Sequence, residues 1–326
     1  MTSTITSTTG AAATAGSTVP RGLTGVVPPV CTPLTPDLEV DVASLLRLVD
    51  FQLAGGVDGL FVLGSSSEVA FLPDRHRATV VDAVVRHVAG QVPVLVGVID
   101  MTTLRVLDHA HRAVRAGCAG IVVTAPFYTR THPAEVELHL RRIAEQCQTP
   151  VYAYDLPVSV HTRLDPQMLL RLAADGVLAG LKDSTGDDAG LRDLLTARDD
   201  AGLSTFTVLT GSELTVDNAL RMGADGVVPG LGNVDPHGYA TLYRHAVAGE
   251  WDLAAREQER LLRLMRIVHV GSSARMGRGS SALGAFKAAL RLRGVIDHAV
   301  TAPPQIQLDD AEIDVVRRTL VATGLL

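Results

Sequence analysis

One local pattern recurs along this chain and constrains its fold more than any single motif does. An amphipathic stretch ends in a glycine, and a short, continuously apolar run follows it, as at residues 54–63, 116–123 and 222–228. Glycine tolerates the left-handed conformation that commonly ends a helix. An apolar run without alternation is typical of a parallel strand that is covered on both faces. The repeating unit is therefore a helix, a loop and a strand.

Eight apolar runs of this kind are present, and most of the segments between them have the length and spacing of helices. They lie near residues 24–31, 59–64, 93–99, 120–126, 150–156, 177–182, 206–211 and 226–230. Eight such units predict an α/β fold of the closed (β/α)₈ type, a TIM barrel. The alternative is a doubly wound open sheet. That fold usually carries a glycine fingerprint after its first strand, where this chain has the proline-containing residues 28–33.

We expect three regions along the chain. Residues 1–21 are low-complexity Thr, Ser, Ala and Gly without the apolar centre of a secretory signal, which is typical of a flexible tail. Residues 22–234 contain the eight units and form the barrel. Residues 235–326 have a mainly helical pattern and are expected to form an appended C-terminal helical region.

Composition excludes several classes of partner. The chain has 326 residues, is 47% hydrophobic and carries a net charge of −6, which argues against a nucleic-acid or anionic-membrane surface. No apolar run reaches the length needed to span a bilayer. The three cysteines, Cys31, Cys118 and Cys147, form no C-x-x-C pair, so we expect reduced thiols in the cytoplasm.

In a barrel of this type the chemistry lies at the carboxyl ends of the strands. Polar residues follow five of the predicted strands, and the barrel would bring them to one mouth. They are residues 64–68, Tyr128, Tyr154, Lys182 and residues 211–213. This convergence is stronger evidence for a site than any one of the motifs.

Lys182 closes the apolar run 177–182. A buried lysine is costly to ionise, and a neutral amine can attack a carbonyl to form a Schiff base. The alternative is a structural lysine paired with the adjacent Asp183. Tyr154 lies near the end of the preceding apolar run. The alternative interpretation is that Tyr154 is a core aromatic residue whose hydroxyl hydrogen-bonds to the backbone.

Residues 64–68 read Gly-Ser-Ser-Ser-Glu at a predicted strand-to-helix turn. Backbone N–H groups and hydroxyls at such a turn can bind a carboxylate without a cation. An ordinary polar turn is the alternative. His109 and His111 are two residues apart on a predicted helix and do not share a face, so no metal site is expected.

Taken together, these motifs resemble the dihydrodipicolinate synthase/N-acetylneuraminate lyase family of class I, Schiff-base-forming, pyruvate-dependent aldolases, over about residues 22–326. The family patterns G-[ST]-[ST]-G-E, P-[YF]-Y, Y-[ND]-x-P and G-[IL]-K-[DE]-[ST] are matched by residues 64–68, 126–128, 154–157 and 180–184. The order and spacing of the four segments agree as well.

The resemblance implies catalytic roles. Lys182 would form a covalent Schiff base with pyruvate or another 2-keto acid, so no metal or other cofactor is expected. Tyr154 would shuttle the proton of the reacting oxygen. Ser65 and Tyr128 would extend that relay, with Tyr128 reaching into the site of a neighbouring subunit. Members of the family are commonly tetramers built as pairs of dimers, so we expect a homotetramer.

The resemblance also implies substrate-binding residues. Ser65 and Ser66 would hold the pyruvate carboxylate, and the backbone at Val228 would line the pocket. Glu213 lies where sugar-acid members place a carboxylate against substrate hydroxyls. Ser184, together with Ser67 where many members have glycine, would add hydroxyl groups.

One departure bears on the second substrate. The synthase proper carries an arginine that binds the carboxylate of aspartate semialdehyde, and Ser159 occupies its place here. We therefore expect a lyase acting on small-molecule keto acids and aldehydes, a 2-keto-3-deoxy sugar acid aldolase or dehydratase. The alternatives are 4-hydroxy-tetrahydrodipicolinate synthase, with His161 or Arg163 in place of the arginine, and a non-catalytic keto-acid sensor.

Overall fold

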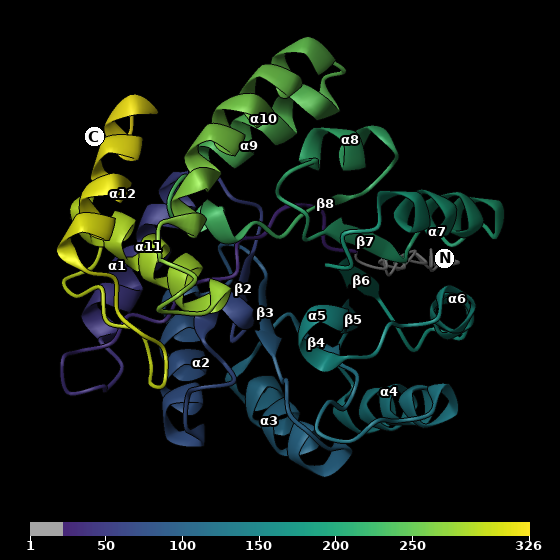
Figure 1. The fold of residues 1–326 in the computed structure, drawn as a ribbon. Coiled ribbons are helices and arrows are strands. Elements are labelled where there is room, and N and C mark those ends of the chain that lie inside the picture. The colour runs from purple at the N-terminus through teal and green to yellow at the C-terminus, as the bar shows by residue number, and fades with distance from the viewer. Residues whose placement is uncertain (1–21) are drawn as a thin grey trace, which may run out of the picture.

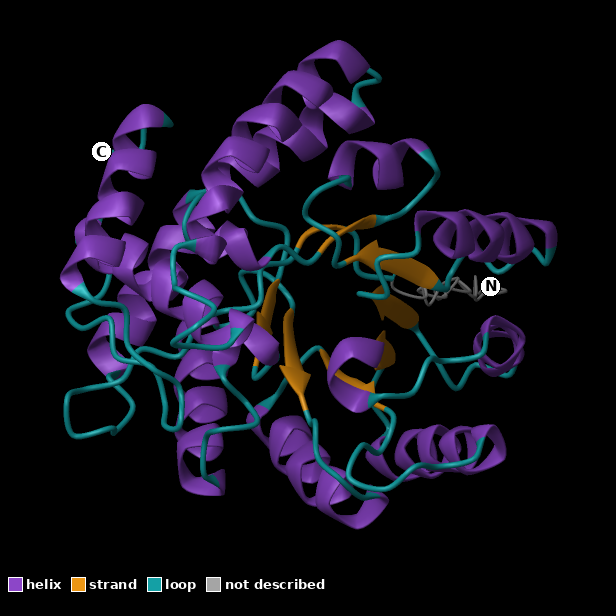
Figure 2. Ribbon diagram, viewed as in Figure 1, coloured by secondary structure: helices purple, strands orange, loops and turns teal. Residues whose placement is uncertain are grey.

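Eight parallel strands form the centre of the molecule. The computed structural model describes residues 22–326, and the tail expected over residues 1–21 lies outside them. Seven of these strands fall within the predicted apolar runs, β6 extends one residue beyond its run, and Figure 2 shows the strands as a ring with helices outside it. Their bounds are β1 Gly25–Val26, β2 Leu60–Val62, β3 Val94–Gly97, β4 Gly120–Thr124, β5 Val151–Asp155, β6 Gly180–Asp183, β7 Thr207–Thr210 and β8 Gly226–Val227.

Strand pairing closes the ring. Hydrogen-bonded neighbours follow the order β1-β8-β7-β6-β5-β4-β3-β2. The two ends meet where Pro29 and Phe61 form a parallel bridge, with the Val30 N–H donating to the Phe61 carbonyl at 2.8 Å. The (β/α)₈ barrel is therefore confirmed, and the open-sheet alternative is wrong.

A helix follows each strand and covers the outside of the barrel (Figure 1). The helix α3 shows how the sequence sets these bounds. Thr102 caps its start by accepting from the Arg105 N–H, and Gly117 ends it at φ 90°, the left-handed conformation expected there. The helices are α1 Val42–Ala54, α2 Asp74–Val88, α3 Thr103–Ala116, α4 Pro133–Cys147, α6 Pro166–Ala174, α7 Asp188–Asp200, α8 Val216–Arg221 and α9 Pro236–Val247.

Three short helical turns lie in loops at the carboxyl ends of strands: η1 Ser65–Ser67 after β2, α5 Pro157–Val160 after β5 and η2 Gly230–Asn233 after β8. The chain then continues through α10 Trp251–Met265, η3 Arg266–His269, α11 Arg278–Leu292 and α12 Asp310–Ala322. Figure 1 shows α11 between α12 and the barrel. Across residues 22–326, no helix combines the length and the apolarity that crossing a membrane requires.

Side chains alternate between two apolar cores along each strand, as the period of a strand requires. On β4, Val122 belongs to a cluster inside the barrel with Phe61, Leu95 and Tyr152. Ile121 and Val123 belong instead to the larger core between strands and helices. The last interior position of β4 is therefore Thr124, at the carboxyl end.

Candidate active site

Lys182 and Tyr154 lie side by side in the uppermost layer inside the barrel. Strand register pairs Thr124 of β4 with Tyr154 of β5, and Tyr154 with Lys182 of β6. Paired residues of neighbouring parallel strands project to the same face, so these three side chains share one layer. Lys182 is 6% exposed and Tyr154 is 2% exposed.

Aromatic faces surround the Lys182 amine. Its Nζ lies 4.1 Å from the centre of the Tyr154 ring and 5.1 Å from that of Phe61. Asp183, the alternative partner considered from the sequence, is engaged elsewhere, because its Oδ1 accepts from the backbone and the hydroxyl of Thr185. None of the ion pairs within residues 22–326 includes Lys182, so no carboxylate holds its amine away from a substrate.

The Tyr154 hydroxyl faces Ser65 rather than a backbone group. The two oxygens are 3.4 Å apart. Burial raises the pKa of Tyr154, but the positive charge of Lys182 and the hydroxyls of Ser65 and Ser184 outweigh it and leave that pKa below its usual value. A phenol with a lowered pKa gives up its proton more readily, so it can act as both donor and acceptor.

The serine turn, residues 64–68, is fixed to the start of the barrel. Ser67 Oγ donates to the Val30 carbonyl at 2.5 Å and accepts from the Gly64 N–H at 3.1 Å. The expectation that Ser67 adds a hydroxyl to the pocket is wrong, because that hydroxyl is fully buried within the turn. Ser65 and Ser66 remain accessible and line the cavity.

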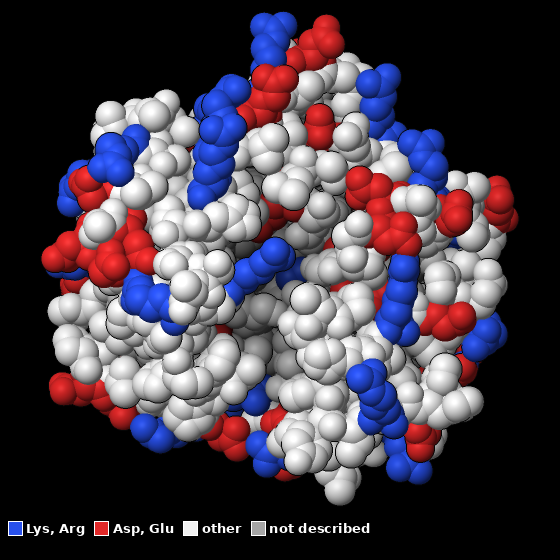
Figure 3. Space-filling model, in the orientation of Figure 1, with Lys and Arg blue, Asp and Glu red and all other residues white. Residues whose placement is uncertain are grey.

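A cavity of about 810 Å³ opens at the mouth of the barrel, and Figure 3 shows the hollow at the centre of this face. Loops from around the barrel, together with α11, form its lining. Seven residues singled out from the sequence line it: Ser65, Ser66, Tyr154, Lys182, Ser184, Glu213 and Val228. The fold thus brings together residues from β5 and β6 and from the segments that follow β2, β6, β7 and β8.

Glu213 is held by protein donors at one side of the cavity. Its Oε1 accepts from the Leu231 N–H at 2.7 Å and from the Tyr239 hydroxyl at 2.9 Å. Burial raises the pKa of Glu213, although these two donors act against the rise. Its geometry is therefore fixed before any substrate arrives.

Tyr128 is the one predicted catalytic residue that lies apart from the others. Its side chain is 83% exposed on the loop after β4 and does not line the cavity. In the single chain it is therefore not part of the cavity. The expectation that it serves a neighbouring subunit remains a prediction.

Two residues of the cavity with buried, unpartnered polar atoms were not anticipated from the sequence. Thr124 is 2% exposed, and its hydroxyl has no hydrogen-bond partner. Gln305, from the loop between α11 and α12, has both atoms of its side-chain amide buried and unpartnered. A hydroxyl near the carboxyl end of the apolar run 120–126 was a usable signal for Thr124, whereas no local pattern marks Gln305.

The loop after β5 places Ser159 on the cavity lining, but neither candidate substitute for the missing arginine joins it. Arg163 pairs with Asp187 at 2.8 Å. His161 is exposed and ends the short helix α5. Among the described residues, Lys182 is the one lysine or arginine that lines the cavity.

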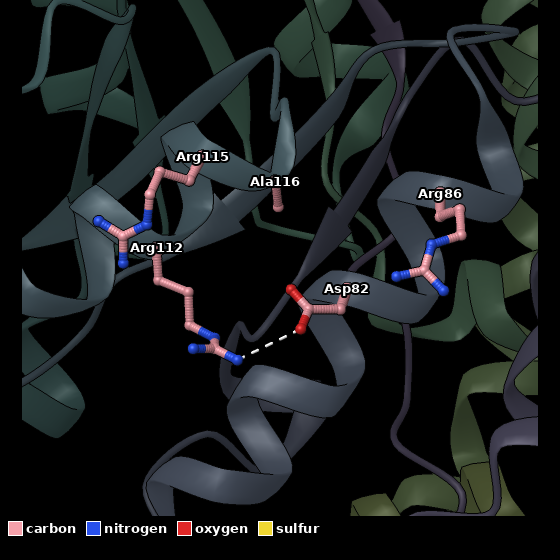
Figure 4. A pocket seen from close by; sticks show the side chains of 5 residues that line it. All are labelled: Asp82, Arg86, Arg112, Arg115 and Ala116. Carbon is pink, nitrogen blue, oxygen red and sulfur yellow. Dashed lines mark hydrogen bonds and ion pairs between the residues drawn. The ribbon is translucent and has the colours of Figure 1, made fainter.

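A second hollow lies on the outside of the helical layer, between α2 and α3 (Figure 4). Arg112 pairs there with Asp82 at 3.2 Å, while Arg86 and Arg115 stand at its edge. All three arginines are exposed, so the hollow lacks the buried polar groups of a binding site. Over residues 22–326, no three His, Cys, Asp or Glu side chains are grouped to hold a metal ion.

Comparison with known proteins yields a consistent set of relatives. The model of the dihydrodipicolinate synthetase family matches residues 22–323. An uncharacterized DapA-like lyase of Halobacterium salinarum is 33% identical over 311 residues, which are 95% of this chain and 97% of that protein. A 4-hydroxy-tetrahydrodipicolinate synthase of Salinibacter ruber is 32% identical over 243 residues, which are 74% of this chain and 79% of that protein.

Solved structures show the same similarity. The prophage protein YagE of Escherichia coli K12, of the dihydrodipicolinic acid synthase family and crystallised in complex with pyruvate, matches with a TM-score of 0.87 at 28% identity. The match covers 93% of this chain and 99% of YagE. Sequence and fold similarity therefore extend over the barrel and the C-terminal helices together.

Proposed function

The chain is a member of the dihydrodipicolinate synthetase family of lyases, and we propose that within this family it is a Schiff-base-forming aldolase or dehydratase for 2-keto-3-deoxy sugar acids. The observation that carries the proposal is the placement of the Lys182 amine against the Tyr154 ring, inside a cavity to which serine and threonine side chains contribute hydroxyl groups. An unpaired amine beside a phenol of lowered pKa suits imine chemistry.

The reaction follows from these two groups. The Lys182 amine attacks the keto carbon, whose oxygen leaves as water, and an iminium ion forms. The iminium accepts the electron pair of the bond between the third and fourth carbons, while Tyr154 takes the proton of the C4 hydroxyl. An aldehyde departs, and the enamine that remains is protonated and hydrolysed to pyruvate. In a dehydratase, the same iminium assists loss of a proton and then of a hydroxyl group.

The serine turn is the proposed site of the keto-acid carboxylate. Ser65 and Ser66 present two hydroxyls on the same cavity as the Lys182 amine. Hydroxyls and backbone N–H groups at such a turn can satisfy a carboxylate. The pyruvate complex recorded for YagE supports a keto-acid ligand in this fold.

The rest of the cavity favours a hydroxylated substrate over a second carboxylate. Ser159, Ser184, Thr124 and Gln305 offer neutral hydrogen-bonding groups, and Glu213 offers an acceptor. The carboxylate of aspartate semialdehyde would have no arginine to pair with among the described residues that line the cavity. A sugar acid chain, by contrast, could pair its hydroxyls with these groups.

The alternative within the family is 4-hydroxy-tetrahydrodipicolinate synthase, the activity named for the Salinibacter relative. The experiment that separates the two measures cleavage of 2-keto-3-deoxygluconate and condensation of pyruvate with aspartate semialdehyde on one preparation. We expect kcat/KM for the sugar acid to exceed that for the semialdehyde by at least tenfold. The reverse ratio would establish the synthase, and no turnover of any keto acid would favour a sensor.

We further propose that the active form is a homotetramer. Tyr128 supports this because an 83% exposed tyrosine beside the active-site mouth is available to a neighbouring copy. Tyr128 would then complete the proton relay of the partner's site. Mixed assemblies of Lys182→Ala and Tyr128→Phe subunits test this contribution.

A further inference from the structure

A fully buried ion pair joins the serine turn to the C-terminal helices. The Lys287 ammonium on α11 donates to Glu68 Oε2 at 2.9 Å, although the two residues are 219 positions apart. Both side chains have 0% exposure. Of the ion pairs within residues 22–326, this is the one in which neither side chain reaches solvent.

Further hydrogen bonds fix the pair in place. The Lys287 ammonium also donates to the Val300 carbonyl at 2.7 Å. The Ala302 N–H donates to both oxygens of Glu68 at 3.4 Å. The carboxylate is therefore held by α11 and by the segment that follows α11, so the C-terminal helices determine where Glu68 lies.

Glu68 in turn holds one end of the serine turn. Its backbone is in the left-handed conformation, φ 62°, and its N–H donates to the Ser65 carbonyl at 3.0 Å. A glutamate adopts that conformation only where its surroundings impose it. Ser67 anchors the turn on the barrel side through the Val30 carbonyl. The two residues that directly follow Ser65 and Ser66 are therefore both held by distant parts of the chain.

The energetics argue that this pair does more than stabilise the fold. Removing two charges from water costs several kcal/mol per ion, and a well-packed apolar pair of similar volume is often equally stable or more so. A buried pair is thus a poor way to gain stability. It is an effective way to fix one arrangement, because its hydrogen-bond geometry is directional.

We propose that the Glu68–Lys287 ion pair positions Ser65 and Ser66 to bind the keto-acid carboxylate, so that the C-terminal helices are part of the substrate site. The inference rests on the proposed function, in which the serine turn binds that carboxylate. Glu68 and Lys287 are positioning residues, since they act through the turn and not on the reacting atoms.

The test replaces both charges at once with Glu68→Leu and Lys287→Met. We expect the double variant to fold and to form the borohydride-trapped adduct at saturating pyruvate. The concentration of pyruvate that gives half-maximal trapping, and KM for the keto acid, should rise by tenfold or more, while kcat falls by less than threefold. A folded double variant with unchanged half-saturation and KM would overturn the proposal.

Glu68→Asp provides a second variant in case the double variant does not fold. Aspartate tolerates the left-handed conformation and keeps the charge, but its carboxylate is one methylene short of Lys287. We expect a rise in KM here too, and an unchanged KM in a folded Glu68→Asp protein would also overturn the proposal.

The matched control is Arg198→Met, which breaks the partly buried Arg198–Asp225 pair, 2.6 Å long, at the amino end of β8. This variant should lose stability and keep the wild-type KM. An equal rise in KM in the control would show that KM merely follows stability, and would overturn the proposal. If wild type itself traps no pyruvate, the proposed function fails. If wild type traps pyruvate and the variants match it, only the positioning role fails.

Discussion

The Lys182 ammonium nitrogen lies 4.1 Å from the centre of the Tyr154 ring, on the adjacent strand of the barrel. Both side chains are almost wholly buried, so little solvent screens the interaction between them. The positive charge of Lys182 favours the phenolate form of Tyr154 and lowers the pKa of that phenol. The strand register therefore creates a coupled donor and acceptor pair.

Tyr154→Phe should separate binding from proton transfer. The variant keeps the ring against Lys182 but removes the hydroxyl that faces Ser65. We expect trapping of pyruvate to persist while kcat falls by about 10²–10⁴, the usual contribution of a general acid–base group. Steady-state kinetics and adduct mass on the same preparation check this, and equal loss of both would contradict the shuttle role.

The pKa of the Tyr154 phenol should depend on Lys182. Burial raises that pKa, whereas the charge of Lys182 and the hydroxyls of Ser65 and Ser184 bring it below the usual value of 10.0. Lys182→Met removes the charge and leaves the burial, so the phenol should titrate at higher pH. NMR of protein labelled at the tyrosine Cζ positions measures the titration, since the chain has only 5 tyrosines to resolve. A pKa that stays unchanged or falls in Lys182→Met would refute the coupling.

Thr124→Val should lower turnover of the sugar acid without changing the trapping of pyruvate. Valine keeps the shape of threonine and removes only the unpartnered hydroxyl that lines the cavity. Because one hydrogen bond to the substrate is lost, we expect kcat/KM for 2-keto-3-deoxygluconate to fall roughly five- to tenfold, with pyruvate trapping unchanged.

The matched control is Thr207→Val, because the Thr207 hydroxyl is also buried and unpartnered but lies at the start of β7, away from the cavity. The control should retain wild-type kinetics. Identical behaviour of the two valine variants would remove Thr124 from the site.

Tyr128 should act across a subunit boundary. Lys182→Ala and Tyr128→Phe homomers are each expected to be impaired. In a mixed assembly, a subunit with intact Lys182 can receive intact Tyr128 from a Lys182→Ala neighbour, so activity should reappear when the two variants are unfolded together and refolded. If Tyr128 served its own chain, no mixture would recover activity.

The barrel could be predicted because its signals are local. Each strand is a short apolar run, and turns such as that at Gly117 end the preceding helix. Residues at the carboxyl ends of strands, including Lys182 and Tyr154, then meet through topology alone. In the motif at residues 64–68, Ser65 and Ser66 line the cavity, whereas Ser67 does not.

The remainder of the site depends on contacts between distant segments. Lys287 meets Glu68 across 219 positions, and Gln305 reaches the cavity from the loop after α11. The sequence pattern of α11 does not predict that one face of this helix packs over the serine turn. The direction of the Ser67 hydroxyl was equally hidden, because its acceptor is the Val30 carbonyl of another segment.

In the proposed function the Lys182 amine condenses with a keto acid. The most direct test of this condensation is to incubate the protein with pyruvate, reduce with borohydride and measure the intact mass and the modified peptide. We predict one pyruvyl adduct per chain, located on Lys182 and absent from Lys182→Ala. No adduct on the wild-type protein, or an adduct that persists in Lys182→Ala, would contradict the account.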